Sequence, residues 1–316
     1  MKYDLSRRLV VGIASSALFD LAESDAVFRQ DGEEAYRRHQ EEHLDRTLGK
    51  GVAFPFVRRL LALNDLADSP EDPLVEVIVL SRNDPDTGLR VMRSVQAHGL
   101  PITRAVFRQG RPAHAFMPAL NMSLFLSANG QDVRGAVAAG LPAGHVLASA
   151  GGGGADAADD PELRIAFDFD GVLADDSSER VFRSGGLDGF RAHEVSNAAT
   201  PLDPGPLRNF LAGVNRIQQR EEEVRRADPG YRPRVHVSLV TARNAPTHER
   251  AVRSLKDWGV RVNEAFFLGG IDKSGVIAAL RPHIFFDDQV THLSGTAAGT
   301  PSVHVPFGAV NELPEA

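Results

Sequence analysis

The chain contains an internal repeat, and this repeat constrains the fold more than any other feature of the sequence. Residues 75–82 and 235–242 are both apolar stretches that carry a hydroxyl residue near the end, Ser81 and Thr241, at an offset of 241 − 81 = 160. A long register without gaps indicates a duplicated structural unit. Identical residues at this offset include Thr87 and Thr247, Arg90 and Arg250, Ser94 and Ser254, Gly99 and Gly259, Phe107 and Phe267, and Phe125 and Phe285.

Each repeat alternates apolar stretches with helical patterns. In the second copy we expect strands near 164–168, 235–240, 263–267, 283–286 and 302–305, with a helix over 247–258 between two of them. Alternation of this kind predicts an α/β fold in which helices cover both faces of a parallel sheet. The sequence therefore predicts two related parallel-sheet halves with a Rossmann-like arrangement.

The domain boundaries follow from the repeat and from composition. Residues 1–150 and 161–316 are expected to be the two halves, and the Gly-, Ala- and Asp-rich residues 151–160 are expected to be the linker. About sixty residues, 176–234, separate the first two strands of the second half. We expect them to form a small helical cap.

The N-terminal segment has two interpretations. Arg7 and Arg8 precede the apolar run 9–14, which resembles a weak signal peptide, but Ser15 interrupts the run. We favour a first β-strand over 9–13, because the repeat requires one there. No run approaches the roughly 20 apolar residues that a membrane span needs, so we expect no membrane partner.

Two carboxylates follow the first strand of the second half. Asp168 and Asp170 come directly after an apolar run, and Gly171 follows them. Acids so close together repel each other and persist where a cation or a proton transfer needs them. A polar turn is the alternative, since Asp and Gly are common turn residues. Because ligands of parallel sheets bind beyond the carboxyl ends of the strands, we favour a functional site.

The repeat permits an internal comparison. The first half lacks the charges of the second at each position that matches a candidate catalytic residue, so we expect it to be a non-catalytic relative of the second half. In the first-strand match Asp168 and Asp170 fall opposite Ile13 and Ser15, Lys273 falls opposite Ala113, and Asp287 and Asp288 fall opposite Ser127 and Ala128.

Composition excludes some classes of function. The net charge of −7 argues against a nucleic-acid partner, which usually requires a basic face. The absence of cysteine excludes disulfides and thiolate metal sites. We treat the eleven histidines as scattered and expect no zinc site.

Four elements of the second half are expected to converge, and together they resemble a known superfamily. They are Asp168 with Asp170, Thr241, Lys273, and Asp287 with Asp288. Their order and residue types resemble the haloacid dehalogenase superfamily of phosphohydrolases. The resemblance implies a haloacid dehalogenase-type fold for both halves, the first of them degenerate.

Further stretches resemble the cytosolic 5′-nucleotidase type I family within that superfamily. They are residues 51–55, 80–83, 204–207, 239–243, 265–268 and 281–289. The resemblance implies a cytoplasmic enzyme that hydrolyses nucleoside 5′-monophosphates such as AMP with the help of Mg²⁺. It also implies that a regulatory nucleotide, for instance ADP, could bind, and that the chain could assemble into a homo-oligomer.

The resemblance implies a role for each matched residue. Asp168 would attack phosphorus and form an aspartyl-phosphate, and Asp170 would act as general acid and then general base. Mg²⁺ would be held by Asp168, by the main-chain carbonyl of Asp170, and by Asp287 or Asp288. The phosphoryl oxygens would be bound by Thr241, Ala242, Arg243 and Lys273.

Each of these residues also has an ordinary structural interpretation. Thr241 suits a helix N-cap, Lys273 suits a solvated surface, and Asp287 with Asp288 suits a turn. Arg243 is equally suited to bind the phosphate or to pair with an acid. In the cap, Phe182, Phe190, His193 and Glu194 are candidates to meet the base or the sugar, with simple packing as the alternative for the two phenylalanines.

Two other functions stay open. One is a haloacid dehalogenase phosphatase that acts on a different small phosphomonoester. The other is a nucleotide sensor without catalysis, against which the intact set of acids argues.

Overall fold

The computed structural model describes residues 3–149, 160–297 and 299–311, so the expected linker lies outside the described residues except for Asp160. The main sheet is built from ten strands. They are β1 (Leu9–Ile13), β4 (Val75–Ser81), β5 (Arg104–Phe107), β6 (Leu124–Ser127), β7 (Ala143–Val146), β8 (Leu163–Phe167), β9 (Val235–Thr241), β10 (Glu264–Phe267), β11 (Ile284–Asp287) and β12 (Ser302–His304). Their order is β10-β9-β8-β11-β12-β7-β6-β1-β4-β5. The predicted α/β fold with a mostly parallel sheet is confirmed.

The two halves of the chain share this one sheet. All neighbouring strands are parallel except β7 and β12, which pair antiparallel with His145 opposite His304. These two histidines are also matched by the sequence repeat. Strands β7 and β12 are the last strands of the first and second half, and they are equivalent in the repeat. Since each pairs with its own counterpart, an approximate two-fold axis relates the halves. The hydrogen-bonded junction between them is a feature that the sequence did not predict.

The strand register corrects the repeat at its first strand. Strands β4 and β9 keep the offset of 160, but Leu9 pairs with Val75 and Leu163 pairs with Val235, which sets the offset of β1 and β8 at 163 − 9 = 154. Asp168 therefore falls opposite Ala14, and Asp170 opposite Ser16, instead of Ile13 and Ser15. The prediction was wrong by one residue, a shift that would turn every side chain of the strand to the other face of the sheet.

Helices cover both faces of the sheet. One face packs against α3 (Phe54–Ala62), α4 (Pro85–Ala97), α7 (Arg208–Ala227) and α8 (His248–Asp257) in a single apolar core that spans both halves. The other face packs against α5 (Gly130–Ala138) in the first half, and against α9 (Ser274–Leu280) and α10 (Val290–Thr296) in the second. Smaller elements are α1 (Ser15–Leu18), β2 (Phe19–Asp20), β3 (Gly49–Lys50), and the short 3-10 helices at Leu63–Leu66, His114–Phe116 and Ala309–Asn311.

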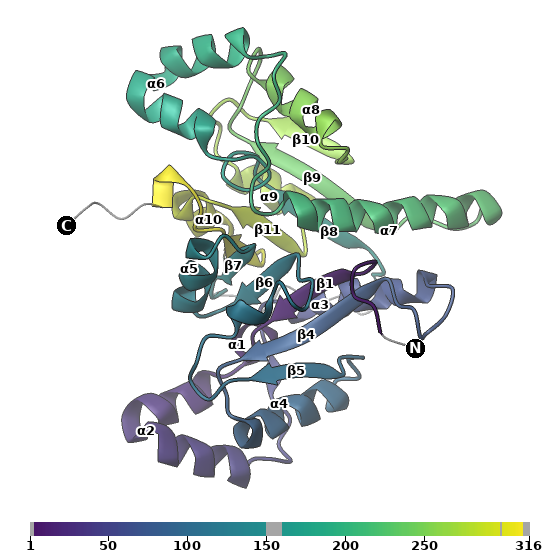
Figure 1. The fold of residues 1–316 in the computed structure, drawn as a ribbon, viewed down its shortest axis with the longest axis vertical. Helices are drawn as coiled ribbons and strands as arrows, with labels where there is room; N and C mark the ends of the chain where they lie inside the picture. The colour runs from purple at the N-terminus through teal and green to yellow at the C-terminus, as the bar shows by residue number, and fades with distance from the viewer. Residues whose placement is uncertain (1–2, 150–159, 298, 312–316) are drawn as a thin grey trace.

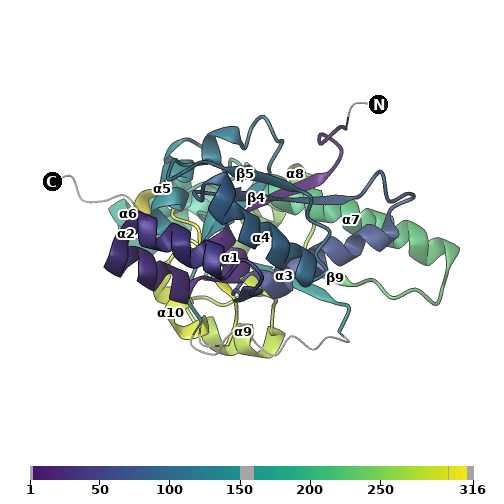
Figure 2. The same cartoon turned by 90° about the horizontal axis from the view of Figure 1, so that it is seen from below.

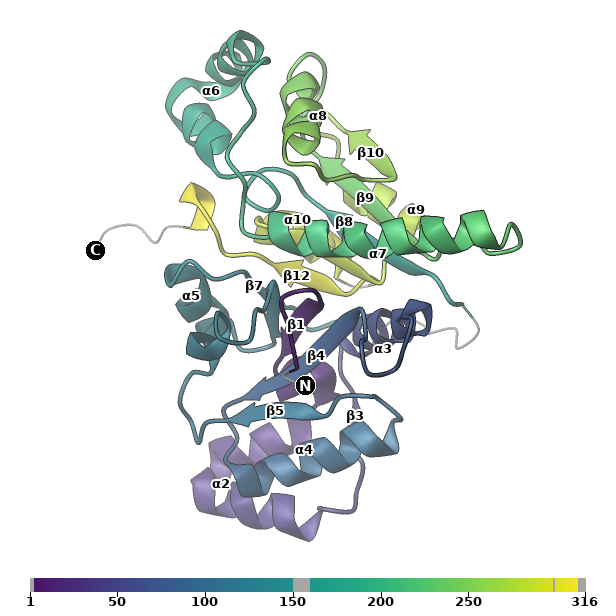
Figure 3. The same ribbon diagram turned by 45° about the vertical axis from the view of Figure 1, so that its right-hand side comes forward.

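Helix α7 belongs to the core and is not part of the expected cap. It crosses the sheet in front of β8 and β9 (Figures 1 and 3). The ring centroid of Phe210 lies 6.1 Å from that of Phe167 and 6.0 Å from that of Phe286, and all three side chains are fully buried. Within residues 176–234, α6 (Ser177–Ser196) is the helix that stands away from the sheet.

A second helix with the shape of α6 occurs in the first half. Helix α2 (Ala22–Glu42) lies along α4 (Figure 2), at the opposite end of the long axis of the molecule from α6 (Figure 1). Both helices are broken at a glycine of positive φ, Gly32 (82°) and Gly186 (62°), which are 154 residues apart. The duplication therefore includes this kinked hairpin, which was expected only in the second half.

Aromatic pairs strengthen the equivalence of α2 and α6. Phe28 and Tyr36 meet edge to face at 5.8 Å in α2, and Phe182 and Phe190 do so at 6.3 Å in α6. Both pairs are 154 residues apart, position by position. Among the described residues, no helix is both long enough and apolar enough to cross a membrane.

Truncation of Phe210 tests the shared core. Phe210→Ala should lower the free energy of unfolding by about 3–5 kcal/mol, because it leaves a cavity among buried aromatic rings. Urea unfolding measures this loss. The control Phe28→Ala, at a site that is 51% exposed, should change it by less than about 1 kcal/mol. Equal effects of the two variants would contradict the role of α7 in the core.

Candidate active site

The predicted site residues of the second half gather at one edge of the sheet. Strands β9, β8 and β11 are neighbours and run parallel, so their carboxyl ends meet. Asp168 follows β8 directly, Thr241 ends β9, and Asp287 ends β11. The order of strands, more than any local sequence, brings these side chains together.

Lys273 lies between two of the carboxylates. Its Nζ is 2.7 Å from Oδ2 of Asp287 and 3.0 Å from Oδ1 of Asp168, and all three side chains are buried. Burial opposes the charge of the lysine, but Asp168 and Asp287 outweigh it and raise the pKa of Lys273. The interpretation as a solvated surface lysine is therefore wrong.

Asp168, Asp287 and Asp288, which we call the acidic cluster, contain more negative charge than Lys273 balances. Burial, reinforced by Asp287 and Asp170 and opposed by Lys273, raises the pKa of Asp168 to about 7. Burial, together with Asp168 and Asp287, raises the pKa of Asp288 to about 9. Two carboxyl groups that resist ionisation in this way need a further positive charge to become carboxylates at neutral pH.

The donor atoms fit a hard divalent cation. Asp168 Oδ1, although close to Lys273, accepts no well-formed hydrogen bond from any described residue. Asp287 stays ionised, because Lys273 and His292 outweigh burial and lower its pKa. Carboxylate oxygens are the ligands that Mg²⁺ and Ca²⁺ prefer. The cluster therefore offers an acidic metal site.

Gly171 is required by the position of Asp288. The backbone of Gly171 has φ 71°, a conformation that favours glycine. A Cβ atom there would lie 2.5 Å from Oδ2 of Asp288. The glycine that follows the two acids thus lets the loop after β8 approach the acidic pair after β11.

His292 is a site residue that the sequence did not reveal. Its Nδ1 lies 3.1 and 3.2 Å from the two oxygens of Asp287. Asp168, Asp287 and His292 offer ligand atoms that all lie within 4.8 Å of one another. In the sequence, His292 is distinguished only by its place five residues after Asp287, in what becomes the first turn of α10. None of the motifs considered in the sequence analysis includes a histidine at that spacing.

Arg243 pairs with an acid, which is one of the two roles considered for it. Its Nε and Nη2 donate to the two oxygens of Asp170 at 2.8 and 2.7 Å, and the guanidinium is buried. It also donates to Ser178 Oγ at 2.9 Å and forms an ion pair with Glu194. Protein groups thus occupy the donors of the guanidinium, and Asp170 is bound in the planar, bidentate geometry that arginine forms with carboxylates.

Glu194 ties the hairpin α6 to this arginine. It is fully buried, and it accepts hydrogen bonds from Ser178 (2.9 Å), Arg250 (2.8 Å) and Arg243. The arginines outweigh burial and lower the pKa of Glu194. Its carboxylate therefore faces the protein interior, which argues against the contact with a base or sugar considered from the sequence.

The other cap candidates are placed differently. The ring of Phe190 lies 5.5 Å from the guanidinium carbon of Arg243, so it covers the arginine that holds Asp170. Phe182 packs on Phe190 and is 43% exposed. His193 is half-buried, with Nδ1 3.2 Å from Glu194. The hairpin thus places one aromatic ring, that of Phe190, against the arginine that holds Asp170.

Thr241 forms a local turn. Its Oγ1 accepts a hydrogen bond from the backbone N–H of Arg243 at 3.2 Å, and Ala242 between them is exposed. Helix α8 begins at His248, so Thr241 is not its N-cap. That structural interpretation is wrong.

The first half repeats this framework with neutral residues in place of Glu194 and Arg243. Arg90 donates to Gln40 at 3.0 Å, as Arg250 donates to Glu194, and Asn83 occupies the position of Arg243. A cavity of about 910 Å³ lies at the carboxyl ends of its strands, where Ser15 and Ser81 hydrogen-bond to each other at 3.0 Å. The same scaffold thus occurs with uncharged residues at the positions that match Asp168, Lys273, Asp287 and Asp288.

Comparison with known proteins gives two findings. The family model described as 5′-nucleotidase matches residues 1–312. Human cytosolic 5′-nucleotidase 1B is 32% identical over 295 residues, which cover 91% of this chain and 47% of that protein. The chain thus spans about half the length of the curated relative that it matches.

The raised pKa values predict how the stability of the metal-free protein depends on pH. The folded state keeps protons on Asp168 and Asp288 that the unfolded chain releases near pH 4. Stability is therefore fully present below about pH 4 and is lost as pH rises through about 7 and 9, by at most about 1.4 kcal/mol per pH unit for each group. Urea unfolding in chelator between pH 6 and 9 measures this slope.

The matched variants for this experiment are Asp288→Asn and Asp257→Asn. Asp288→Asn should flatten the slope between pH 7 and 9, whereas Asp257→Asn, on the exposed end of α8, should leave it unchanged. An unfolding free energy of the wild type that does not fall over this range would contradict the charge imbalance.

Proposed function

The chain belongs to the 5′-nucleotidase family, and from this premise we propose that it hydrolyses nucleoside 5′-monophosphates, AMP among them, to nucleoside and phosphate. The observation that carries the proposal is the buried cluster of Asp168, Asp287 and Lys273 at the strand ends of the second half. This cluster is a reaction centre of the haloacid dehalogenase type, and the matched positions of the first half carry no charge.

The acidic cluster is suited to Mg²⁺. The ion would be held by Asp168, by the main-chain carbonyl of Asp170, and by Asp287 or Asp288, while His292 orients Asp287 through its hydrogen bond. When bound, the ion offsets the negative charge of the phosphate dianion and of the acids themselves.

The chemistry then runs through two carboxylates. An oxygen of Asp168 attacks phosphorus, the bond from phosphorus to the ribose 5′ oxygen breaks, and Asp170 gives that oxygen a proton. Asp170 next takes a proton from the water that hydrolyses the aspartyl-phosphate. The Lys273 ammonium, the Thr241 hydroxyl and the backbone N–H of Ala242 bind the phosphoryl oxygens.

Arg243 has a positioning role in this scheme instead of the phosphate-binding role considered from the sequence. Its two hydrogen bonds fix the plane of the Asp170 carboxylate, and Glu194 and Ser178 fix the arginine in turn. The exposed faces of Phe182 and Phe190 are then suited to stack on the base.

The first half completes the proposal. Residues 1–150 form a non-catalytic half, residues 151–160 the linker, and residues 161–316 the catalytic half with its cap hairpin. The cavity of about 910 Å³ in the first half is large enough for a regulatory nucleotide. A cytoplasmic location, as in the name of the human relative, and a homo-oligomeric state belong to the same proposal.

Replacement of the nucleophile tests the proposed reaction. Asp168→Asn should reduce phosphate release from AMP by roughly 10³-fold or more, because no other group can form the acyl phosphate. The variant weakens the ion pair with Lys273 but also removes one of the repelling charges, so it should stay folded, and urea unfolding checks this. Asp257→Asn is the matched surface control. Retained turnover in Asp168→Asn, or activity on other phosphomonoesters with none on any nucleotide, would overturn the proposal.

A second variant separates positioning from phosphate binding. Arg243→Lys cannot hold both oxygens of Asp170, so kcat should fall by roughly 10- to 100-fold with little change in KM. Steady-state kinetics with AMP measure both constants, and Arg253→Lys on the exposed face of α8 is the control. A rise in KM with an unchanged kcat would instead assign Arg243 to the phosphate.

A further inference from the structure

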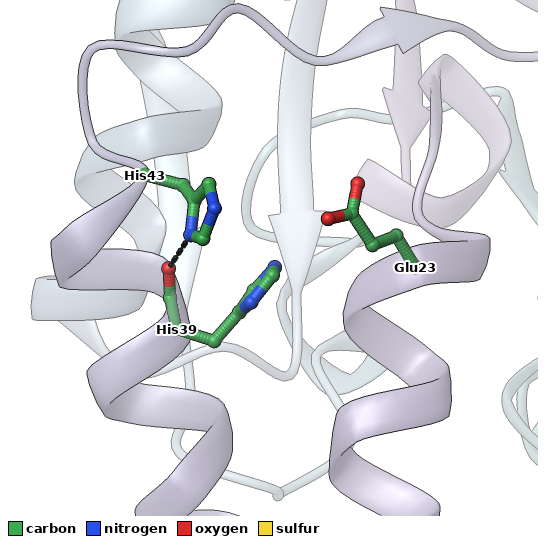
Figure 4. Close-up of side chains that lie close together, drawn as sticks. All are labelled: Glu23, His39 and His43. Atoms are coloured by element: carbon green, nitrogen blue, oxygen red, sulfur yellow. Dashed lines mark hydrogen bonds between the residues drawn. The ribbon is translucent and has the colours of Figure 1, made fainter.

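Three side chains with metal-binding donors lie together on the hairpin α2 of the first half, far from the acidic cluster in the fold. Glu23 is in the first turn of one limb, and His39 and His43 are on the other limb, beyond the break at Gly32 (Figure 4). One ligand atom from each residue lies within 4.8 Å of the other two. The two limbs therefore bring a carboxylate and two imidazoles to one point.

The helix places both histidines on one face. His39 and His43 are four residues apart, and residues at that spacing are neighbours on a helix surface. Their ring centroids are 4.3 Å apart. The expectation from the sequence that the histidines are scattered is wrong here, because His39 and His43 form a pair at positions i and i+4.

A backbone hydrogen bond fixes the tautomer of His43. Its Nδ1 lies 2.8 Å from the carbonyl oxygen of His39, which can only accept, so Nδ1 carries the hydrogen. The Nε2 atom of the same ring then has a free lone pair. Histidines that bind metals are commonly oriented in this way through their other nitrogen.

His39 has a nitrogen that no other interaction uses. Its Nε2 is buried and has no hydrogen-bond partner among the described residues. Buried polar atoms are nearly always satisfied, so this one calls for a ligand. The carboxylate of Glu23 is paired with Arg46 at 3.1 Å, but both side chains are more than half exposed. Such surface pairs are weak and can exchange partners.

The equivalent hairpin α6 shows that the fold does not need these donors. At the offset of 154, Glu23, His39 and His43 correspond to Ser177, His193 and Asn197. Asn197 donates to the carbonyl of His193 at 2.8 Å, as His43 does to that of His39. The hairpin thus forms with one of the three donors, and the other two occur in the first half alone.

We propose that Glu23, His39 and His43 form a zinc site that clamps the two limbs of α2, with water as the fourth ligand. Two imidazoles and a carboxylate suit zinc, whereas the three carboxyl groups of Asp168, Asp287 and Asp288 suit a harder ion. Binding would stabilise the first half, because Gln40, between the two histidines in sequence, is bonded to Arg90 of α4. The site is independent of the reaction proposed for the second half.

The experiment is a zinc titration of the full chain, stripped of metal and then kept in excess Mg²⁺ so that the acidic cluster is already occupied. Calorimetry should show one equivalent of Zn²⁺ per chain, and thermal unfolding should show a rise in Tm. Cobalt substitution should give an absorption spectrum typical of tetrahedral nitrogen and oxygen ligands.

The variants copy the residues that α6 already has at the same positions. Glu23→Ser and His43→Asn should weaken zinc binding by at least roughly 10- to 100-fold and abolish the Tm rise, without unfolding the apo-protein. His236→Asn, a surface histidine on β9, is the matched control. Absence of zinc binding in excess Mg²⁺, or the same affinity in the two variants as in the wild type, would overturn the proposal.

Discussion

The ion pairs of Lys273 with Asp168 and Asp287 are the interaction on which the second half depends. They place one positive charge among buried carboxylates that repel one another, and that charge is not enough. The resulting imbalance explains why the site fits a divalent cation. It also explains why the loop after β8 needs glycine at position 171, since a larger residue would displace Asp288 from the cluster.

The duplicated scaffold separates what the fold needs from what the chemistry needs. Both halves keep the kinked hairpin, the edge-to-face aromatic pair and the arginine that anchors the hairpin, on α4 in the first half and on α8 in the second. In the second half Glu194 and Arg243 add charge to this anchor and connect it to Asp170. In the first half the corresponding residues, Gln40 and Asn83, are neutral. The cap of the second half is thus joined to its acids by a buried ionic chain.

Prediction from the sequence worked where the signal was periodic or local. The strand pattern gave the α/β fold, and the repeat gave the correspondence of the halves. The predicted match was wrong by one residue at the first strand of each half. The offset between the halves is 154 at the first strands and 160 at the second strands, because the connection between these strands is six residues longer in the second half. Prediction from the sequence also assigned α7 to a cap, since the helical pattern alone does not tell which surface a helix covers. Phe210, Phe167 and Phe286 decide this by packing together.

The sequence by itself determined which residues are candidates for the proposed phosphoryl chemistry, because acids, a lysine and a threonine at the ends of apolar strands can be recognised from the residue types alone. Only the tertiary structure decided their partners. His292 reaches Asp287, Arg243 turns to Asp170, and Glu194 is buried, because packing in three dimensions sets these directions. The same holds for the junction of β7 with β12, since hydrogen bonds between two edge strands depend on how the halves dock and leave no pattern in either strand.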